Sequence, residues 1–480
     1  MSEATPFDFD LAVIGSGGGA FAAAIRATNL GKRVVMVERS TIGGTCVNTG
    51  CVPSKALLAA AEARRVSFDA ARFPGISTSA GPVDMAELIG GKRSLVETMR
   101  SDKYVDLIRE YGWELRQGNA VFTGSQEEPV LEITAADGGR EDVRAGHYLV
   151  ATGSAPWTPP VAGLRDVDYL TSTTAMELDA VPESLLVFGG GYVALEQAQL
   201  FARLGSTVTV LVRSRLASRE EPEAALALAG VFADEGIRVI SRAAISTVRT
   251  DPETGEVVAT ANVAGGEREF RADRLLVATG RRPVTDGLNL GAVGVTTGDA
   301  GQILVTNTLT STNPRVWAAG DVTGHREFVY VAASHGSLMV ENAFNNAGRE
   351  VNYRHLPRVT FTSPALAAVG MTDQEANDAG IRCECRVLPL EYVPRALVNR
   401  DTRGFIKIVA DADTRRIVGI TAVAKDAGDL AAAGVYILEA GMTVEQVANL
   451  WSPYLTMAEG LRIAALSFTT DVSRLSCCAS

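Results

Sequence analysis

Two cysteines, Cys46 and Cys51, are separated by four residues in a glycine-rich segment, GGTCVNTGCVPSK, which spans residues 43–55. A thiol at the start of a helix lies near the positive end of the helix dipole, which lowers its pKa and provides a thiolate near neutral pH. The alternatives are a structural pair and a zinc site, but zinc needs two further ligands, and no other cysteine or histidine is near in sequence. The spacing therefore favours a redox-active pair.

The other four of the six cysteines also form close pairs, and six are too few for a disulfide scaffold in 480 residues. Cys477 and Cys478 are adjacent, so their Cα atoms lie ~3.8 Å apart, closer than a relaxed disulfide allows. Two thiols near a chain end are suited to capture of a soft cation. Cys383 and Cys385 are predicted on one face of a strand and are interpreted as two small buried apolar side chains.

Two glycine turns each follow an apolar strand and precede a helix and a second strand. The first reads GSGGGA over residues 15–20, and the second reads GGGYVA over residues 189–194. Such a turn brings backbone N–H groups and a helix N-terminus close to a pyrophosphate. We expect two dinucleotide sites, with Gly15, Gly17 and Ala20 in the first and Gly189, Gly191 and Ala194 in the second.

The residue that ends the second strand of each unit indicates which ribose is bound. After the first turn this residue is Glu38, an acceptor for ribose hydroxyls, as in FAD or NAD. After the second it is Arg213, with Arg215 and Arg219 close behind. Arginines can pair with a 2′-phosphate, so the second site is predicted to prefer NADPH. The alternative is that these arginines are solvated surface residues.

Composition indicates a folded globular protein and disfavours a membrane-spanning or nucleic acid-binding one. The chain is 46% hydrophobic and 21% charged, with a net charge of −11, which is typical of a folded globular protein and unfavourable for nucleic acid binding. No apolar run approaches the ~20 residues of a membrane span, and the N-terminus lacks the features of a signal peptide. We therefore expect a cytoplasmic location, with neither membrane nor nucleic acid as a partner.

The order of the predicted elements gives the domain organisation. Two similar strands end in ATG at residues 151–153 and 278–280, and the pattern becomes α+β from about residue 352. We predict an α/β fold with two Rossmann-like domains and a C-terminal α+β domain. The expected segments are 1–153 (FAD domain, first part), 154–280 (NADPH domain), 281–350 (FAD domain, second part) and 351–480 (dimerisation domain).

Together with GGGYVALE, ATGRRP and AAGDV further along, these motifs resemble those of the pyridine nucleotide-disulfide oxidoreductases. The resemblance covers nearly the whole chain and implies FAD, NADPH and a homodimer whose active sites are shared between subunits. It also implies that Cys51 is the thiolate beside the flavin and that Cys46 faces the substrate. Further residues matched by motif are Lys55 and Glu196 as an ion pair near the flavin, Tyr192 as the gate of the nicotinamide pocket, Asp321, Gly44, Thr45 and Gly153 for FAD, and Gly280 for NADPH.

The sequence departs from the members that reduce disulfides near its C-terminus. Those members carry a histidine that shuttles protons to the leaving thiol, whereas this chain has Tyr454 there and keeps the partner Glu459. A phenol with a pKa near ~10 cannot replace an imidazole near ~6.5 in this task. The four histidines of the chain lie elsewhere and are interpreted as structural. A disulfide substrate is therefore disfavoured.

A dicysteine tail and a tyrosine in place of the histidine resemble the Hg(II)-reducing branch of the family. This resemblance implies that Hg(II), held by small thiols, is captured by Cys477 and Cys478 of one subunit and passed to the Cys46 and Cys51 pair of the other. Tyr192 and Tyr454 would lie beside the metal. Because the first glycine turn begins at residue 15, we expect no preceding metal-binding domain. Alternatives are a thioredoxin reductase-like enzyme with a Cys-Cys tail and a flavoprotein that only sequesters metal.

Overall fold

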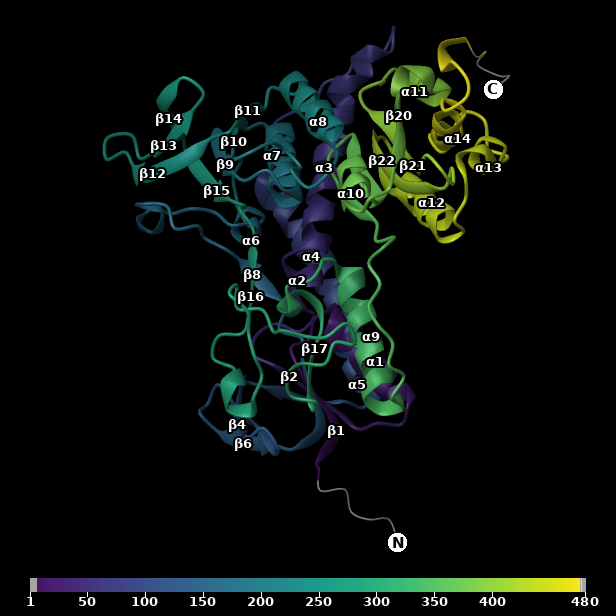
Figure 1. Ribbon diagram of the computed structural model, residues 1–480. Coiled ribbons are helices and arrows are strands. Elements are labelled where there is room, and N and C mark those ends of the chain that lie inside the picture. Colours follow the sequence, from purple (N-terminus) through teal and green to yellow (C-terminus); the bar gives the residue numbers. More distant parts are fainter. Residues whose placement is uncertain (1–6, 475, 477–480) are drawn as a thin grey trace. The chain divides into compact units, whose positions relative to one another are not determined.

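The structure is a computed structural model that describes residues 7–474 and residue 476 (Figure 1). The chain folds into two compact units. Residues 57–86, which we expected in the first domain, belong to the second unit. The functions assigned to the predicted segments stay predictions. The first unit comprises residues 1–56, 87–157 and 280–351, and the second comprises residues 57–86, 158–279 and 352–480.

The first unit is built on a parallel sheet with the strand order β17-β7-β1-β2-β3. Side chains alternate along β1, so that Leu11 and Val13 pack with helix residues while Ala12 and Ile14 pack with Phe122 on the other face. The strands are β1 (Phe9–Ile14), β2 (Val34–Glu38), β3 (Glu114–Gln117), β7 (Ala145–Val150) and β17 (Val316–Ala318), with an antiparallel meander of β4 (Asn119–Gly124), β5 (Pro129–Thr134) and β6 (Arg140–Val143) and the pair β8 (Ser154–Pro156) and β16 (Arg281–Pro283).

Helices α1 (Gly18–Asn29) and α9 (Val329–Asn345) pack side by side, although they come from distant parts of the sequence (Figure 1). Glycines allow this approach, since a Cβ atom on Gly336 would lie 2.1 Å from the carbonyl oxygen of Gly19. The segment that returns after residue 280 therefore completes the layer around the first glycine turn.

The second unit contains the second Rossmann-like sheet, which is parallel with the order β11-β10-β9-β15. Its strands are almost wholly apolar, as expected where a parallel sheet is covered on both faces. The elements are β9 (Ser184–Phe188), β10 (Thr207–Val212), β11 (Arg238–Ser241) and β15 (Arg274–Val277), helices α6 (Ser172–Ala175), α7 (Tyr192–Leu204) and α8 (Pro222–Asp234), and an antiparallel sheet of β12 (Ala244–Thr250), β13 (Val257–Val263) and β14 (Gly266–Ala272).

The predicted C-terminal α+β region is a five-stranded antiparallel sheet in the order β18-β19-β22-β21-β20, which leaves β20 at one edge. The elements are β18 (Arg358–Thr360), β19 (Ala365–Gly370), β20 (Cys383–Pro389), β21 (Phe405–Asp411) and β22 (Ile417–Ala424), with α10 (Asp373–Asp378), α11 (Pro394–Asn399), α12 (Ala427–Glu439), α13 (Val444–Ala448) and α14 (Glu459–Leu466).

A helical stretch lies between β2 and β3 of the first sheet. No helix among the described residues is long and apolar enough to cross a bilayer. The helices are α2 (Gly44–Asn48), α3 (Cys51–Asp69), α4 (Met85–Arg100) and α5 (Asp106–Tyr111), and a single π-helical turn, Ser101–Val105, joins α4 to α5.

Candidate active site

The two cysteines of the glycine-rich segment lie on consecutive helices, with Cys46 inside α2 and Cys51 as the first residue of α3. Gly44 makes this placement possible. Its φ is +65°, and a Cβ atom added there would lie 2.6 Å from the Cα atom of Gly17. The redox segment therefore packs directly against the first glycine turn.

The two thiols are close enough to share a proton. The hydrogen bond to Cys51 raises the pKa of Cys46 well above its usual range, burial adds to this effect, and the charge of Lys55 opposes it. The lowered thiol pKa that we expected from the helix start therefore does not belong to Cys46. A Cys46 thiol that donates to Cys51 stabilises negative charge on Cys51, as the family resemblance requires.

Tyr104 is a neighbour of the pair that sequence reasoning missed. It lies in the π-helical turn, and burial together with the negative charges of Cys46 and Cys51 raises its pKa. Its ring packs edge-on against Phe21, with 4.8 Å between ring centroids. Its position in a helical stretch gave no chemical signal, because only the tertiary fold brings the phenol to the thiols.

The first glycine turn and the end of β2 are joined by hydrogen bonds. The Ser16 hydroxyl donates to the Glu38 carboxylate at 2.6 Å and accepts the Gly43 N–H at 3.0 Å. The Ser40 N–H donates to the other Glu38 oxygen at 2.8 Å. This places a buried carboxylate, 8% exposed, at the strand end where a ribose would lie.

The turn itself fits a pyrophosphate. Gly15 has φ +103°, and a Cβ atom there would lie 2.5 Å from the Ala151 carbonyl oxygen. No side chain caps the N-terminus of α1 at Gly17, so the backbone at the positive end of the helix dipole carries no side-chain acceptor. Ala20 is fully buried and permits close packing of the helix. These residues suit the pyrophosphate of a dinucleotide.

Asp321 belongs to a small polar group in the first unit. The Ser154 hydroxyl donates to its carboxylate at 2.7 Å and accepts from the Arg281 guanidinium at 2.7 Å. The preceding Gly320 donates its N–H to Nδ1 of His335 at 3.2 Å. The turn that carries Asp321 is therefore fixed from both sides.

The second glycine turn resembles the first in its geometry. Gly189 has φ +130°, and a Cβ atom there would lie 2.3 Å from the Ala278 carbonyl oxygen, whereas a Cβ atom at Gly191 would meet no atom within 4 Å. No side chain caps α7, which begins after Gly191, and Ala194 is fully buried. The space before α7 therefore also suits the pyrophosphate of a dinucleotide.

The arginines that follow β10 divide into two kinds. The Arg215 guanidinium donates to four backbone carbonyls between residues 217 and 221, the shortest at 2.7 Å to Glu220, so it is a loop-stabilising residue rather than a phosphate ligand. The Ala217 N–H also donates to the Gly190 carbonyl at 2.8 Å, which ties this loop to the glycine turn. Arg213 and Arg219 are exposed and make no hydrogen bond or ion pair within the described part of the chain.

Helix α7 holds the segment 361–364 with three polar side chains on one face. Glu196, 6% exposed, accepts the Phe361 N–H at 2.9 Å. Gln199 accepts the Ser363 N–H at 2.7 Å and donates to its carbonyl at 2.9 Å. The Arg203 guanidinium donates to the same carbonyl at 3.0 Å. This set of bonds fixes Glu196 on the first turns of α7.

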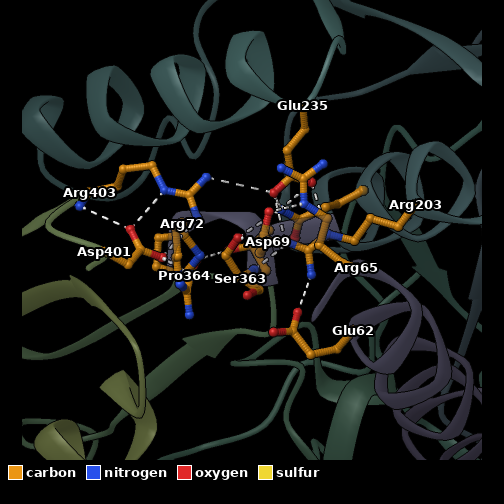
Figure 2. A network of polar contacts seen from close by, with 12 residues as sticks. Glu62, Arg65, Asp69, Arg72, Arg203, Glu235, Ser363, Pro364, Asp401 and Arg403 are labelled. Carbon is orange, nitrogen blue, oxygen red and sulfur yellow. Dashed lines mark hydrogen bonds and ion pairs between the residues drawn. The ribbon is translucent and has the colours of Figure 1, made fainter. Parts of the chain in front are cut away.

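Figure 2 shows the polar network around Arg203. The Arg203 guanidinium binds both oxygens of Glu235, at 2.7 and 2.8 Å, and also contacts Glu62 on α3. Both members of the Arg203–Glu235 pair are buried, at 5% and 1% side-chain exposure. The network therefore fastens α7 to α3 and to the end of α8 within the second unit.

The remaining predicted residues are placed as follows. Tyr192, the first residue of α7, is 37% exposed, and Tyr454 is 49% exposed. Glu459 is buried and accepts the Leu455 N–H at 3.3 Å. Lys55 and Glu196 belong to different units, so their ion pair stays a prediction. Gly153 and Gly280 have positive φ, Thr45 is exposed in α2, and Cys477 and Cys478 lie outside the described residues.

The four histidines lie outside the segment that carries Tyr454 and Glu459. Burial lowers the pKa of His147 and of His335 to about 4, and it also lowers the pKa of His325. His355 is hydrogen-bonded to Glu439 at 2.9 Å. An imidazole with a pKa of about 4 is neutral at physiological pH and cannot replace the missing proton shuttle beside Glu459.

Comparison with known proteins identifies the class. Residues 9–336 match the model of the pyridine nucleotide-disulphide oxidoreductase family, and residues 356–465 match its dimerisation domain. The chain belongs to this family, which uses a flavin and a nicotinamide cofactor, and the second match indicates a homodimer. The predicted fold class is thereby confirmed.

Within the family, several curated proteins similar to this chain are mercuric reductases, which confirms the resemblance drawn from the tail and Tyr454. The chain is 56% identical to that of Streptomyces lividans over 98% of both proteins, and 44% identical to that of Staphylococcus aureus over 98% of this chain and 84% of the relative. Among solved structures, the HOCl-induced flavoprotein disulfide reductase RclA from Escherichia coli has a TM-score of 0.83 at 26% identity, covering 96% of this chain and all of that one. LpdA from Mycobacterium tuberculosis has the same TM-score and coverage at 25% identity.

Proposed function

We propose that this chain catalyses the NADPH-dependent reduction of thiol-bound Hg(II) to Hg(0), with FAD as its flavin, as part of mercury detoxification in the cytoplasm. The reaction balances as one hydride, carrying two electrons, from NADPH to Hg(II), with release of NADP⁺ and one proton. When bound, the flavin would supply the two-electron transfer between nicotinamide and metal. The main support is that the chain combines two features: the Cys46–Cys51 dithiol, and Tyr454 in place of a proton-shuttling histidine.

The choice of cofactors follows from the residues at the ends of β2 and β10. Glu38, fixed by Ser16 and Ser40, is an acceptor for the ribose hydroxyls of FAD. Arg213 and Arg219 are exposed cations on a loop tied to the second glycine turn, and no internal carboxylate neutralises them within the described residues. This arrangement suits the 2′-phosphate of NADPH, which NADH lacks.

In this proposal the thiols of Cys46 and Cys51 bind the substrate Hg(II). Hg(II) is a soft cation that prefers thiolates, and it exchanges between thiol pairs without any change of oxidation state. Cys477 and Cys478 of the partner subunit would take Hg(II) from small thiols and pass it to Cys46 and Cys51. Each transfer forms one metal–sulfur bond and breaks one, and the released thiolate takes up a proton.

The test is NADPH consumption with Hg(II) in excess thiol, compared with thioredoxin, glutathione disulfide and lipoamide as substrates. We expect that, of these four substrates, only thiol-bound Hg(II) supports NADPH consumption. Turnover with a disulfide but not with Hg(II) would show a thioredoxin reductase-like or related enzyme instead. Cys477→Ala/Cys478→Ala should still allow NADPH to reduce the flavin but should fail on thiol-bound Hg(II), and unchanged turnover would remove the tail from the mechanism.

A further inference from the structure

Cys383 and Cys385 lie on β20, the edge strand of the antiparallel sheet, and are separate from the proposed redox pair. Their Sγ atoms are 3.8 Å apart, and both side chains are partly exposed. Neither belongs to the apolar core of this region, which includes Leu388 and Ala410. The interpretation of these cysteines as buried apolar side chains was therefore wrong, and two adjacent thiols remain without a role.

The thiols face a polar environment. Cys383 Sγ lies 3.6 Å from the Asn377 side-chain oxygen and 3.8 Å from the Asp373 carbonyl oxygen, both on α10. Glu384, between the cysteines, points the other way and binds Arg386 and Arg415. The strand alternation thus presents both sulfurs to one side, together with oxygen atoms of α10.

Negative charge exceeds positive charge beside the pair. The buried Lys407, 1% exposed, binds Glu221, Asp373 and Glu223 at 2.8, 2.8 and 3.0 Å. Three carboxylates therefore surround a single ammonium. Lys407 and Asp373 both act on the Cys385 thiol, whose pKa is raised to about 12 chiefly by burial and then by Cys383. A surplus of carboxylates favours a cation as ligand.

The geometry limits which chemistry two such thiols can perform. Residues two apart on a strand are separated by about 6.8 Å, the upper limit for the Cα atoms of a disulfide, so an internal disulfide would be strained. No group of three or more His, Cys, Asp or Glu side chains suited to a metal occurs within residues 7–474 and 476, so a four-coordinate zinc site is not formed there. Two collinear metal–sulfur bonds of about 2.3 Å span about 4.6 Å, which a small side-chain rotation would reach from 3.8 Å.

We propose that Cys383 and Cys385 form a dithiol site that binds one two-coordinate thiophilic cation of the Hg(II), Ag(I) or Cu(I) class. Each sulfur loses a proton and forms one bond to the metal, whose previous thiol ligands take up protons, and no electron is transferred. The site holds metal without reducing it. This inference does not rest on the proposed function, because it concerns binding alone.

The test uses the full chain with Cys46, Cys51, Cys477 and Cys478 changed to Ser, which leaves only this pair. The protein is incubated with HgCl₂ in excess glutathione without NADPH and desalted, and bound metal is counted by mass spectrometry. We expect one Hg(II) per chain, with AgNO₃ also bound and ZnCl₂ lost on desalting. Changing either remaining cysteine to Ser should weaken retention against glutathione by about 100-fold, because the second bond is then no longer intramolecular.

The matched control adds Cys383→Val and Cys385→Val, because valine is of similar size and is common in strands, and circular dichroism with thermal melting verifies folding. This control should bind no Hg(II). Absence of Hg(II) on the folded four-serine protein, or equal binding to the valine control, would overturn the proposal. Because NADPH is omitted, failure of Hg(II) reduction in the separate turnover assay would leave this result unaffected.

Discussion

The Glu196 carboxylate accepts the Phe361 N–H at 2.9 Å, so a buried acid on the second βαβ unit is fixed by the segment that connects β18 to β19 in the C-terminal sheet. This contact positions Glu196 irrespective of any ion pair with Lys55. It also separates two roles of the carboxylate, since a neutral amide can accept the same hydrogen bond but cannot carry the charge.

Glu196→Gln should therefore keep the fold and impair the reaction. We expect the melting temperature to change little and the rate of flavin reduction by NADPH, followed in a stopped-flow spectrometer, to fall about 10-fold, as for loss of a charge interaction of about 1.4 kcal/mol. Lys55→Met in the same assay should give a similar loss, with little further loss in the double variant. Additive losses would show that the two residues act separately.

Arg213→Ala and Arg219→Ala should each reduce kcat/KM for NADPH by about 10-fold or more, because a charge-assisted hydrogen bond contributes about 1.5–3 kcal/mol. The rate with NADH should stay constant, since NADH has no 2′-phosphate. Arg215→Ala is the matched control: it should lower the melting temperature through loss of its four carbonyl contacts and affect both nucleotides alike. Equal losses with NADPH and NADH for Arg213→Ala would contradict the assignment.

Cys51→Ala should make Cys46 more reactive. The hydrogen bond to Cys51 is the largest cause of the raised pKa of Cys46, so its removal should increase the thiolate fraction and the rate of alkylation by iodoacetamide at about pH 8, measured by peptide mass spectrometry. Lys55→Met should act in the opposite direction, because Lys55 lowers this pKa. An unchanged alkylation rate in Cys51→Ala would show that the two thiols do not share a proton.

Acid should destabilise the protein partly through His335. Burial and the nearby His325 lower the pKa of His335 to about 4, below its value of ~6.5 in an unfolded chain, so the unfolded state binds the proton more tightly. The contribution of the neutral ring is therefore complete above about pH 6.5 and is lost as the pH falls toward 4, by about 3 kcal/mol. His335→Asn keeps an acceptor for the Gly320 N–H. In this variant the free energy of unfolding, measured with urea, should depend less on pH over this range. A slope as steep as that of the natural chain would exclude His335 as its source.

Arg203→Met should destabilise the second unit by about 3–5 kcal/mol, because the buried Glu235 loses its bidentate partner and keeps only Gln199 at 3.3 Å and Arg403 at 4.0 Å. The double variant Arg203→Met/Glu235→Met should recover a large part of this loss. Arg403→Met, which removes a half-buried partner of Asp401 in the same network, should cost less. Chemical denaturation of the natural chain and the three variants measures these differences. Equal losses for Arg203→Met and the double variant would mean that the poorly compensated charge of Glu235 is not the cause.

The parts of the fold that follow periodicity could be predicted from sequence. An apolar strand precedes the second glycine turn and a helix follows it, as the pattern predicted, because parallel strands buried on both faces are almost purely apolar. The residues around the thiols could not be predicted. Tyr104 reaches the pair only through the tertiary fold, and Arg215 resembles its neighbours in sequence although its contacts are with backbone carbonyls.

For Cys383 and Cys385, too, the sequence predicted the local arrangement but not the surroundings. Strand alternation predicted correctly that both thiols share one face, but it did not reveal that β20 would be an edge strand. Exposure depends on strand order, which arises from pairings with residues far away in sequence, and exposure decides whether a thiol fills space or binds a ligand.

The packing of α1 on α9 has a consequence for synthesis of the chain. Gly19 and Gly336 meet backbone to backbone, and β17 adjoins β7 in the same sheet, so the first glycine turn obtains its full surroundings only after the region around residue 345 has left the ribosome. The nascent first unit must wait, with an incomplete helix layer, while the whole intervening domain is translated. Flavin uptake should therefore be a late event in biogenesis, and truncated chains that end before α9 should emerge without the cofactor.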